Sequence, residues 1–154
     1  MPIRDADARW EGSLEQGKGS FCAHSATQKT GRPSRRSVAG GYTLGSRTGE
    51  EARGSSPEEL LAAAEAACYS MALTAALQRA GTPPRFVDTH ASCTFRAELT
   101  GGITITRLQL TVRAQVPEAD PERFQETVQA VKVNCPVSRA LRALDIEVQA
   151  ELLA

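Results

Sequence analysis

The sequence lacks the marks of secreted and membrane proteins. Its start, MPIRDADARW, is charged, and no apolar run approaches the roughly 20 residues of a membrane span. Lys plus Arg and Asp plus Glu each total 18, so the net charge is zero and does not favour nucleic acid as a partner. We therefore expect a soluble, cytoplasmic protein that binds neither nucleic acid nor membrane.

The chain is also poor in the residues that build metal sites and disulfide scaffolds. Its only histidines are His24 and His90, and no CxxC or HxxxH spacing occurs, so we expect no metal site. The cysteines are too sparse for a small disulfide-rich domain; they are Cys22, Cys68, Cys93 and Cys135. A free cysteine is most often a small buried hydrophobe, and that interpretation stays open for each of them.

What is present suffices for one core. The 154 residues are 41% hydrophobic, which suits a single domain over residues 1–154. Alternating polar and apolar residues predict three strands in ARWEGSLEQ, GSFCAHSAT and SVAGGYTLGS, and three more in FVDTHASCTFRAEL, ITITRLQLTVRAQV and IEVQAELL. Thr100, Gly101 and Gly102 are typical of a hairpin turn, and the basic segment KTGRPSRRS is typical of a solvated loop.

The clearest element is a helix from Ser56 to about Ala80. Ser56 is a good N-cap, Pro57 suits the first helical position, and Glu59 completes a capping box. Gly81 ends the helix. The interior is rich in Ala and apolar nearly all round, so we expect a central helix that is buried on most faces.

Two shorter helices follow the second pair of strands. One is expected from Asp120 to about Val133, and the other in PVSRALRAL, because Pro136 ends one helix and can open the next. The free N–H groups of that second helix start would stabilise a Cys135 thiolate. Cys68 lies deep inside the apolar helix, where desolvation raises its pKa, so its activation requires a cation from elsewhere. This order of strands and helices predicts an α+β fold.

SSPEELLAAAEAACYSMAL, with NCPVSRAL much later in the chain, closely resembles the OsmC/Ohr family of hydroperoxide-reducing proteins. The likeness covers nearly the whole chain and begins at ARWEG. It is closer to the OsmC branch, because Arg47 stands just before the PEEL helix. The resemblance implies antiparallel sheets around a long central helix in an intertwined homodimer.

The resemblance also implies site residues. Cys68 would be the peroxidatic nucleophile and Cys135 the resolving cysteine, with Arg47 as the cation and Glu58 as the carboxylate that orients it. Arg47 as a solvated loop residue and Glu58 as a helix-start acid remain open alternatives. Glu58 and Cys68 lie ten residues apart, about 15 Å along a helix. In a site that contains both, either Arg47 bridges from an intermediate position or a second subunit contributes, and the family's homodimer would supply that subunit.

Two residues beside the nucleophile depart from the family pattern. Glu65 stands where OsmC members usually carry histidine, and an unpaired carboxylate there would raise the pKa of Cys68. Tyr69 replaces the usual Phe, so its hydroxyl would contact the site or reach solvent. Cys22 and Cys93 match no catalytic position of the family, and we expect both to be structural.

The resemblance thus predicts a thiol-dependent peroxidase that has no bound cofactor. It would reduce organic hydroperoxides through a Cys68 sulfenic acid and a Cys68–Cys135 disulfide, which a partner protein's dithiol, of the lipoyl type, would reopen. Two other classes stay open. One is a non-catalytic module that holds a fatty or aromatic ligand, and the other is a peroxide sensor in which Cys22 or Cys93 takes part.

Overall fold

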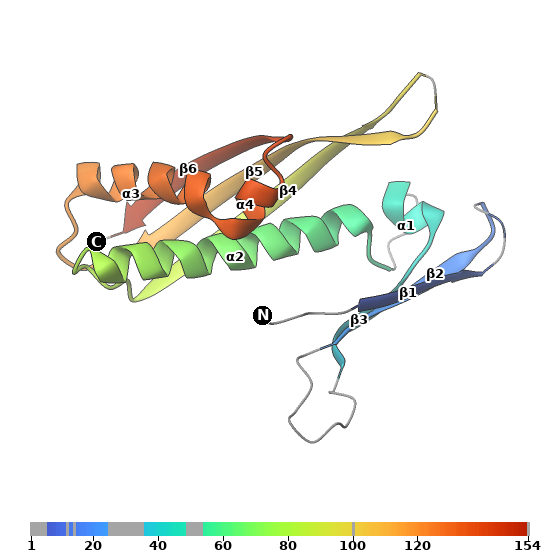
Figure 1. The fold of residues 1–154 in the computed structure, drawn as a ribbon, viewed down its shortest axis with the longest axis horizontal. Helices are drawn as coiled ribbons and strands as arrows, with labels where there is room; N and C mark the ends of the chain where they lie inside the picture. The colour runs from blue at the N-terminus through green and yellow to red at the C-terminus, as the bar shows by residue number, and fades with distance from the viewer. Residues whose placement is uncertain are drawn as a thin grey trace. The chain divides into compact units, whose positions relative to one another are not determined.

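A computed structural model describes residues 6–11, 13, 15–24, 36–48, 54–99 and 101–153. The chain divides into two compact units, Met1–Pro57 and Glu58–Ala154, whose elements are drawn in Figure 1. Most of the basic loop expected before the third strand lies outside the described residues, as does Thr100 of the expected hairpin.

The N-terminal unit contains the three strands that the alternation predicts. They are β1 (Ala6–Glu11), β2 (Lys18–His24) and β3 (Arg36–Tyr42), and they form an antiparallel sheet in that order. Gly19 pairs with Tyr42 across two strands, and a Cβ on Gly19 would lie 2.3 Å from the Tyr42 ring. Trp10 packs on the same ring at 5.6 Å between centroids, so the glycine makes room for an aromatic pair.

A short helix, α1 (Leu44–Thr48), follows β3 where the sequence predicted more strand. The backbone N–H of Ser46 donates to Thr43 Oγ1, and the N–H of Thr43 donates to Ser46 Oγ, each at 3.0 Å. This reciprocal pair resembles a capping box and favours a helix start. The strand prediction was wrong here because two short polar side chains satisfy the backbone locally, and Arg47 consequently lies on α1.

The C-terminal unit has a second sheet, ordered β4 (Phe86–Ala97), β5 (Ile103–Gln115) and β6 (Asp145–Leu153). β4 and β5 form the expected antiparallel hairpin, and Gly101 and Gly102 adopt φ values of 88° and 99° in its turn. β6 instead pairs with β5 in parallel, contrary to the expected antiparallel arrangement. The two helices between β5 and β6 return the chain across the sheet, which permits a parallel pairing.

The helices of this unit are α2 (Pro57–Arg79), α3 (Pro121–Asn134) and α4 (Pro136–Ala140). α2 ends as expected at Gly81, whose φ is 82°. The N–H groups of Gly81 and Thr82 donate to the carbonyls of Gln78 and Leu77, which is a Schellman ending. α4 is shorter than expected, because the chain turns after Ala140.

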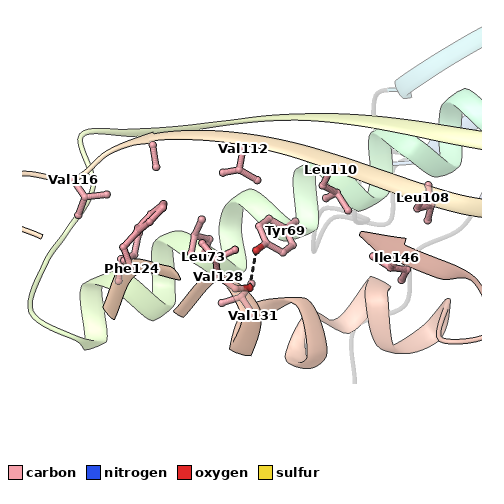
Figure 2. Packing of buried hydrophobic residues seen from close by; sticks show 12 residues of the cluster. Tyr69, Leu73, Leu108, Leu110, Val112, Val116, Phe124, Val128, Val131 and Ile146 are labelled. Carbon is pink, nitrogen blue, oxygen red and sulfur yellow. Dashed lines mark hydrogen bonds between the residues drawn. The ribbon is translucent and has the colours of Figure 1, made fainter. Parts of the chain in front are cut away.

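The core lies between one face of β5 and the two longer helices (Figure 2). Alternate residues of β5 point into it, and α2 and α3 cover them, as the strand and helix periodicities require. The largest contributors are Leu108, Leu110, Val112, Tyr69, Leu73, Phe124 and Val128. The opposite face of β5 is polar, and Arg113 pairs there with Glu151 at 3.0 Å. The unit is thus two layers, helices on sheet.

Within one copy of the chain, the described residues bury only one stripe of α2, and not most of its faces as the sequence predicted. The stripe repeats every three or four residues and consists of Glu58, Ala62, Glu65, Tyr69, Leu73 and Leu77. Outside it, Met71 is 75% exposed and Leu60 37%. By length and composition α2 could also cross a membrane, contrary to the sequence-based estimate, although core helices of soluble proteins pass the same test.

Candidate active site

The structure places Cys68 and Cys135 side by side. Cys68 lies on α2 and Cys135 between α3 and α4, and the Cys135 thiol donates to Cys68 Sγ at 3.2 Å. Both thiols are free. A disulfide needs about 2.05 Å between sulfurs, so a shift of about 1 Å would join them. The geometry suits reversible formation of a bond between two residues that are distant in the sequence.

The backbone of Cys135 is held on both sides. Its N–H donates to Val131 O at 2.8 Å and closes α3, while its carbonyl accepts from Arg139 N–H at 2.9 Å and opens α4. Pro136 enforces this break, since it has no N–H to continue α3. The Cys135 residue is only 1% exposed, so its sulfur is directed inward to α2.

The pKa of the Cys68 thiol is raised. Burial is the largest cause, as the sequence predicted, and the negative charges of a Cys135 thiolate and of Glu65 raise it further. The backbone N–H of Val137 donates to the Cys68 sulfur and lowers the pKa. The start of α4 was expected to help Cys135 alone, but Val137 directs an N–H at Cys68. That donor does not outweigh burial, so thiolate formation still calls for a cation.

Glu65 is fully buried, and its carboxylate forms a hydrogen bond that the sequence did not reveal. Ser138 Oγ on α4 donates to Glu65 Oε1 at 2.5 Å. Glu65 Oε2 is buried with no hydrogen-bond partner among the residues described. The carboxylate is therefore paired on one oxygen only. One signal was present in the sequence: Glu65 stands three residues before Cys68, and Ser138 stands three residues after Cys135.

The Tyr69 hydroxyl ties α2 to α3. It donates to the backbone carbonyl of Val128 at 2.9 Å, and the residue is fully buried, so the hydroxyl does not reach solvent (Figure 2). Burial raises the pKa of the phenol, and the charges of Cys135 and Glu65 raise it further. The phenol therefore stays a hydrogen-bond donor at neutral pH.

The other two predicted site residues occupy different positions. Glu58 is 2% exposed in the first turn of α2. Its charge acts on Cys93 of β4, where burial first and Glu58 second raise the pKa of that thiol. Arg47 belongs to α1 in the N-terminal unit, whereas Cys68 belongs to the C-terminal unit, so the role of Arg47 stays a prediction.

A cavity of about 790 Å³ lies along α4, but neither sulfur borders it. Its lining includes Lys132, Arg139 and Arg142, with Leu144 and Ile146. Within the described ranges, no group of three or more His, Cys, Asp and Glu side chains could hold a metal ion.

Comparisons with known proteins show what the chain as a whole is similar to. The family model for OsmC-like proteins matches residues 49–150. The chain is 35% identical to the peroxiredoxin OsmC of Escherichia coli (strain K12) over 140 residues. These aligned residues cover 91% of this chain and 90% of that protein. The chain resembles the OsmC-like protein of Mycoplasma pneumoniae with a TM-score of 0.71 and 15% identity, over 99% of both chains. The organic hydroperoxide resistance protein OhrB of Bacillus subtilis gives 0.58 and 23%, over 97% and 98%. These structures confirm the expected fold class.

Proposed function

Because the chain belongs to the OsmC-like protein family, we propose that it is a thiol-dependent peroxidase that reduces organic hydroperoxides to alcohols. A relative at 35% identity is named a peroxiredoxin, which supports a redox role with peroxides. The observation on which the proposal rests is the 3.2 Å separation of the Cys68 and Cys135 sulfurs. A pair of free thiols at that distance can alternate between the reduced state and a disulfide.

The reaction would proceed in two covalent steps. The Cys68 thiolate attacks the distal peroxide oxygen, the O–O bond breaks, and the alkoxide takes up a proton and leaves as the alcohol. Cys68 is now a sulfenic acid. The Cys135 sulfur then attacks the Cys68 sulfur, the S–O bond breaks, and the hydroxyl leaves with the thiol proton as water. An external dithiol, of the lipoyl type, reopens the disulfide by exchange.

Activation of Cys68 is the step for which the C-terminal unit is incomplete. Burial keeps the pKa of the thiol raised in spite of the Val137 N–H. We assign the missing cation to Arg47, whose guanidinium is permanently charged and can hold a thiolate or a peroxide oxygen, with Glu58 orienting it. Glu58 lies about three helical turns before Cys68, so either Arg47 bridges the two from an intermediate position or a second subunit contributes to the site, and our proposal takes the second subunit.

The exposed apolar face of α2 supports that second subunit. Beside Met71 and Leu60 the face consists of small residues, namely Ala63, Ala64, Ala67 and Ala75. Such a face lets another helix approach closely, and an exposed apolar patch marks an interaction site. We assign it to a second copy of this chain, in a homodimer in which the two units of each chain act as one domain. The free cysteines suit the cytoplasm.

The test is consumption of cumene hydroperoxide and hydrogen peroxide with dithiothreitol as reductant. Cys68→Ser is expected to abolish turnover, and Cys135→Ser to stop at a sulfenic acid when reductant is left out. Cys93→Ser, at a half-buried thiol outside the pair, is the matched control and keeps full activity. We expect cumene hydroperoxide to react faster, since each buried methylene contributes roughly 0.8 kcal/mol. Equal activity of Cys68→Ser and wild type would overturn the assignment.

A further inference from the structure

Two side-chain contacts join α2 to α4, and they lie one helical turn apart on both helices. The first is the sulfur pair of Cys68 and Cys135. The second is the hydrogen bond from Ser138 to Glu65, with Glu65 three residues before Cys68 and Ser138 three residues after Cys135. Residues at that spacing share one helix face. The hydrogen bond therefore sits directly beside the place where the disulfide would form.

α4 depends on such contacts for its position. It has only five residues and begins with Pro136, and so short a helix is not stable by itself. Glu65 is fully buried and Ser138 is 4% exposed, so water does not compete for their bond. A buried carboxylate without a partner is strongly unfavourable, and hydrogen bonds to carboxylates are about twice as strong as neutral ones. Glu65 Oε2 has no hydrogen bond within the described ranges, so the bond from Ser138 to Oε1 is the main hydrogen bond of this carboxylate.

We propose that Glu65 and Ser138 are a positioning pair that holds Cys135 beside Cys68 and so favours disulfide formation over further oxidation of Cys68. The inference rests on the proposed peroxidase function and extends it. Neither residue contacts the peroxide in this proposal. They act through α4, which bears Cys135 at its start.

The reason lies in the two fates of the Cys68 sulfenic acid. In one, Cys135 attacks it, an S–S bond forms and water leaves. In the other, a second hydroperoxide transfers an oxygen to it, which gives a sulfinic acid and an alcohol. The first fate is intramolecular and depends on the position of the Cys135 sulfur, while the second depends on the peroxide concentration. A misplacement of about 1 Å can slow an oriented reaction about a hundredfold, so the position of α4 controls this partition.

Three variants separate the hydrogen bond from the charge and from stability. Glu65→Gln keeps an oxygen that can accept from Ser138 and removes the charge, so it is expected to partition like the wild type. Ser138→Ala removes the donor and leaves the carboxylate unsatisfied. The double variant Glu65→Leu with Ser138→Ala replaces both partners by apolar groups, which can be nearly neutral in stability. If Ser138→Ala alone does not fold, the double variant still tests the positioning role in a folded protein.

The measurement is the partition of the reduced protein after addition of cumene hydroperoxide without reductant. Intact-mass analysis with dimedone trapping gives the amounts of sulfenic acid, disulfide and sulfinic acid over time. We expect wild type and Glu65→Gln to form mostly disulfide. Ser138→Ala and the double variant are expected to form it about tenfold more slowly or worse, and to reach half sulfinic acid at about tenfold less peroxide.

The outcomes are distinguishable. If the folded double variant forms disulfide as fast as the wild type, the positioning role is overturned and the peroxidase function stands. If Glu65→Gln overoxidises as readily as Ser138→Ala, the charge and not the hydrogen bond matters, which also overturns it. If wild type forms neither sulfenic acid nor disulfide, the proposed function fails first. A thermal melt of each variant shows whether a change in partition follows from a loss of fold.

Discussion

Replacing Tyr69 by Phe is expected to lower stability without stopping the peroxide reaction. The variant removes one hydroxyl, which donates to Val128 O at 2.9 Å inside the core. A hydrogen bond of this kind contributes about 0.5–1.5 kcal/mol. The Val128 carbonyl keeps its helical bond within α3, so the variant leaves no orphaned acceptor, and we expect a loss near 1 kcal/mol.

A loss of about 1 kcal/mol lowers the melting temperature of a domain of about 150 residues by roughly 2–4 °C. The assay is urea unfolding at neutral pH, where the raised pKa of the phenol keeps the donor protonated. Tyr42→Phe is the matched control, because the Tyr42 hydroxyl has no hydrogen bond to the described residues, and we expect it to change stability by less than about 0.5 kcal/mol.

Two results would refute this reasoning. If Tyr69→Phe is as stable as the wild type, the bond to Val128 contributes nothing. If Tyr69→Phe reacts with cumene hydroperoxide more than about tenfold slower at unchanged stability, the hydroxyl acts in the reaction and not in packing. The expected pattern is reduced stability with a nearly unchanged rate, since the hydroxyl bonds α3 rather than the sulfur pair.

Further predictions concern charge and assembly. Only the thiolate reacts with peroxide, and the pKa of Cys68 is raised, so the rate of this reaction is expected to increase as the pH rises. Glu65→Gln removes a negative charge and lowers the pKa of Cys68. In stopped-flow assays of this variant the increase in rate is therefore expected at lower pH. Arg47→Ala is expected to slow the same reaction by at least about tenfold, while Arg9→Ala, in an exposed pair of the same unit, leaves it unchanged. Met71→Glu is expected to convert the proposed homodimer into monomers in sedimentation experiments; a dimer of unchanged stability would place the interface elsewhere.

Local backbone chemistry was readable from the sequence alone. Pro57 begins α2, Gly81 follows its end, and Gly101 and Gly102 form the hairpin turn. Proline fixes φ and glycine permits positive φ in any surroundings, so these positions can be predicted locally. Pro136 likewise forced the break that separates α3 from α4. The cysteine motifs were specific enough to identify the family, which the comparisons confirm.

Tertiary structure alone decided which residues meet. The partner of Glu65 stands 73 residues away, and the matching three-residue spacing of Ser138 from Cys135 points to it only once the two sulfurs are known to lie side by side. The Val137 N–H at the Cys68 sulfur and the parallel placement of β6 likewise depend on how α4 packs on α2 and on where the helices return the chain. Propensities and turns act over a few residues, whereas burial and hydrogen bonding between distant segments depend on the packed core. The sequence therefore identified the sulfur pair by resemblance, and packing determined what surrounds it.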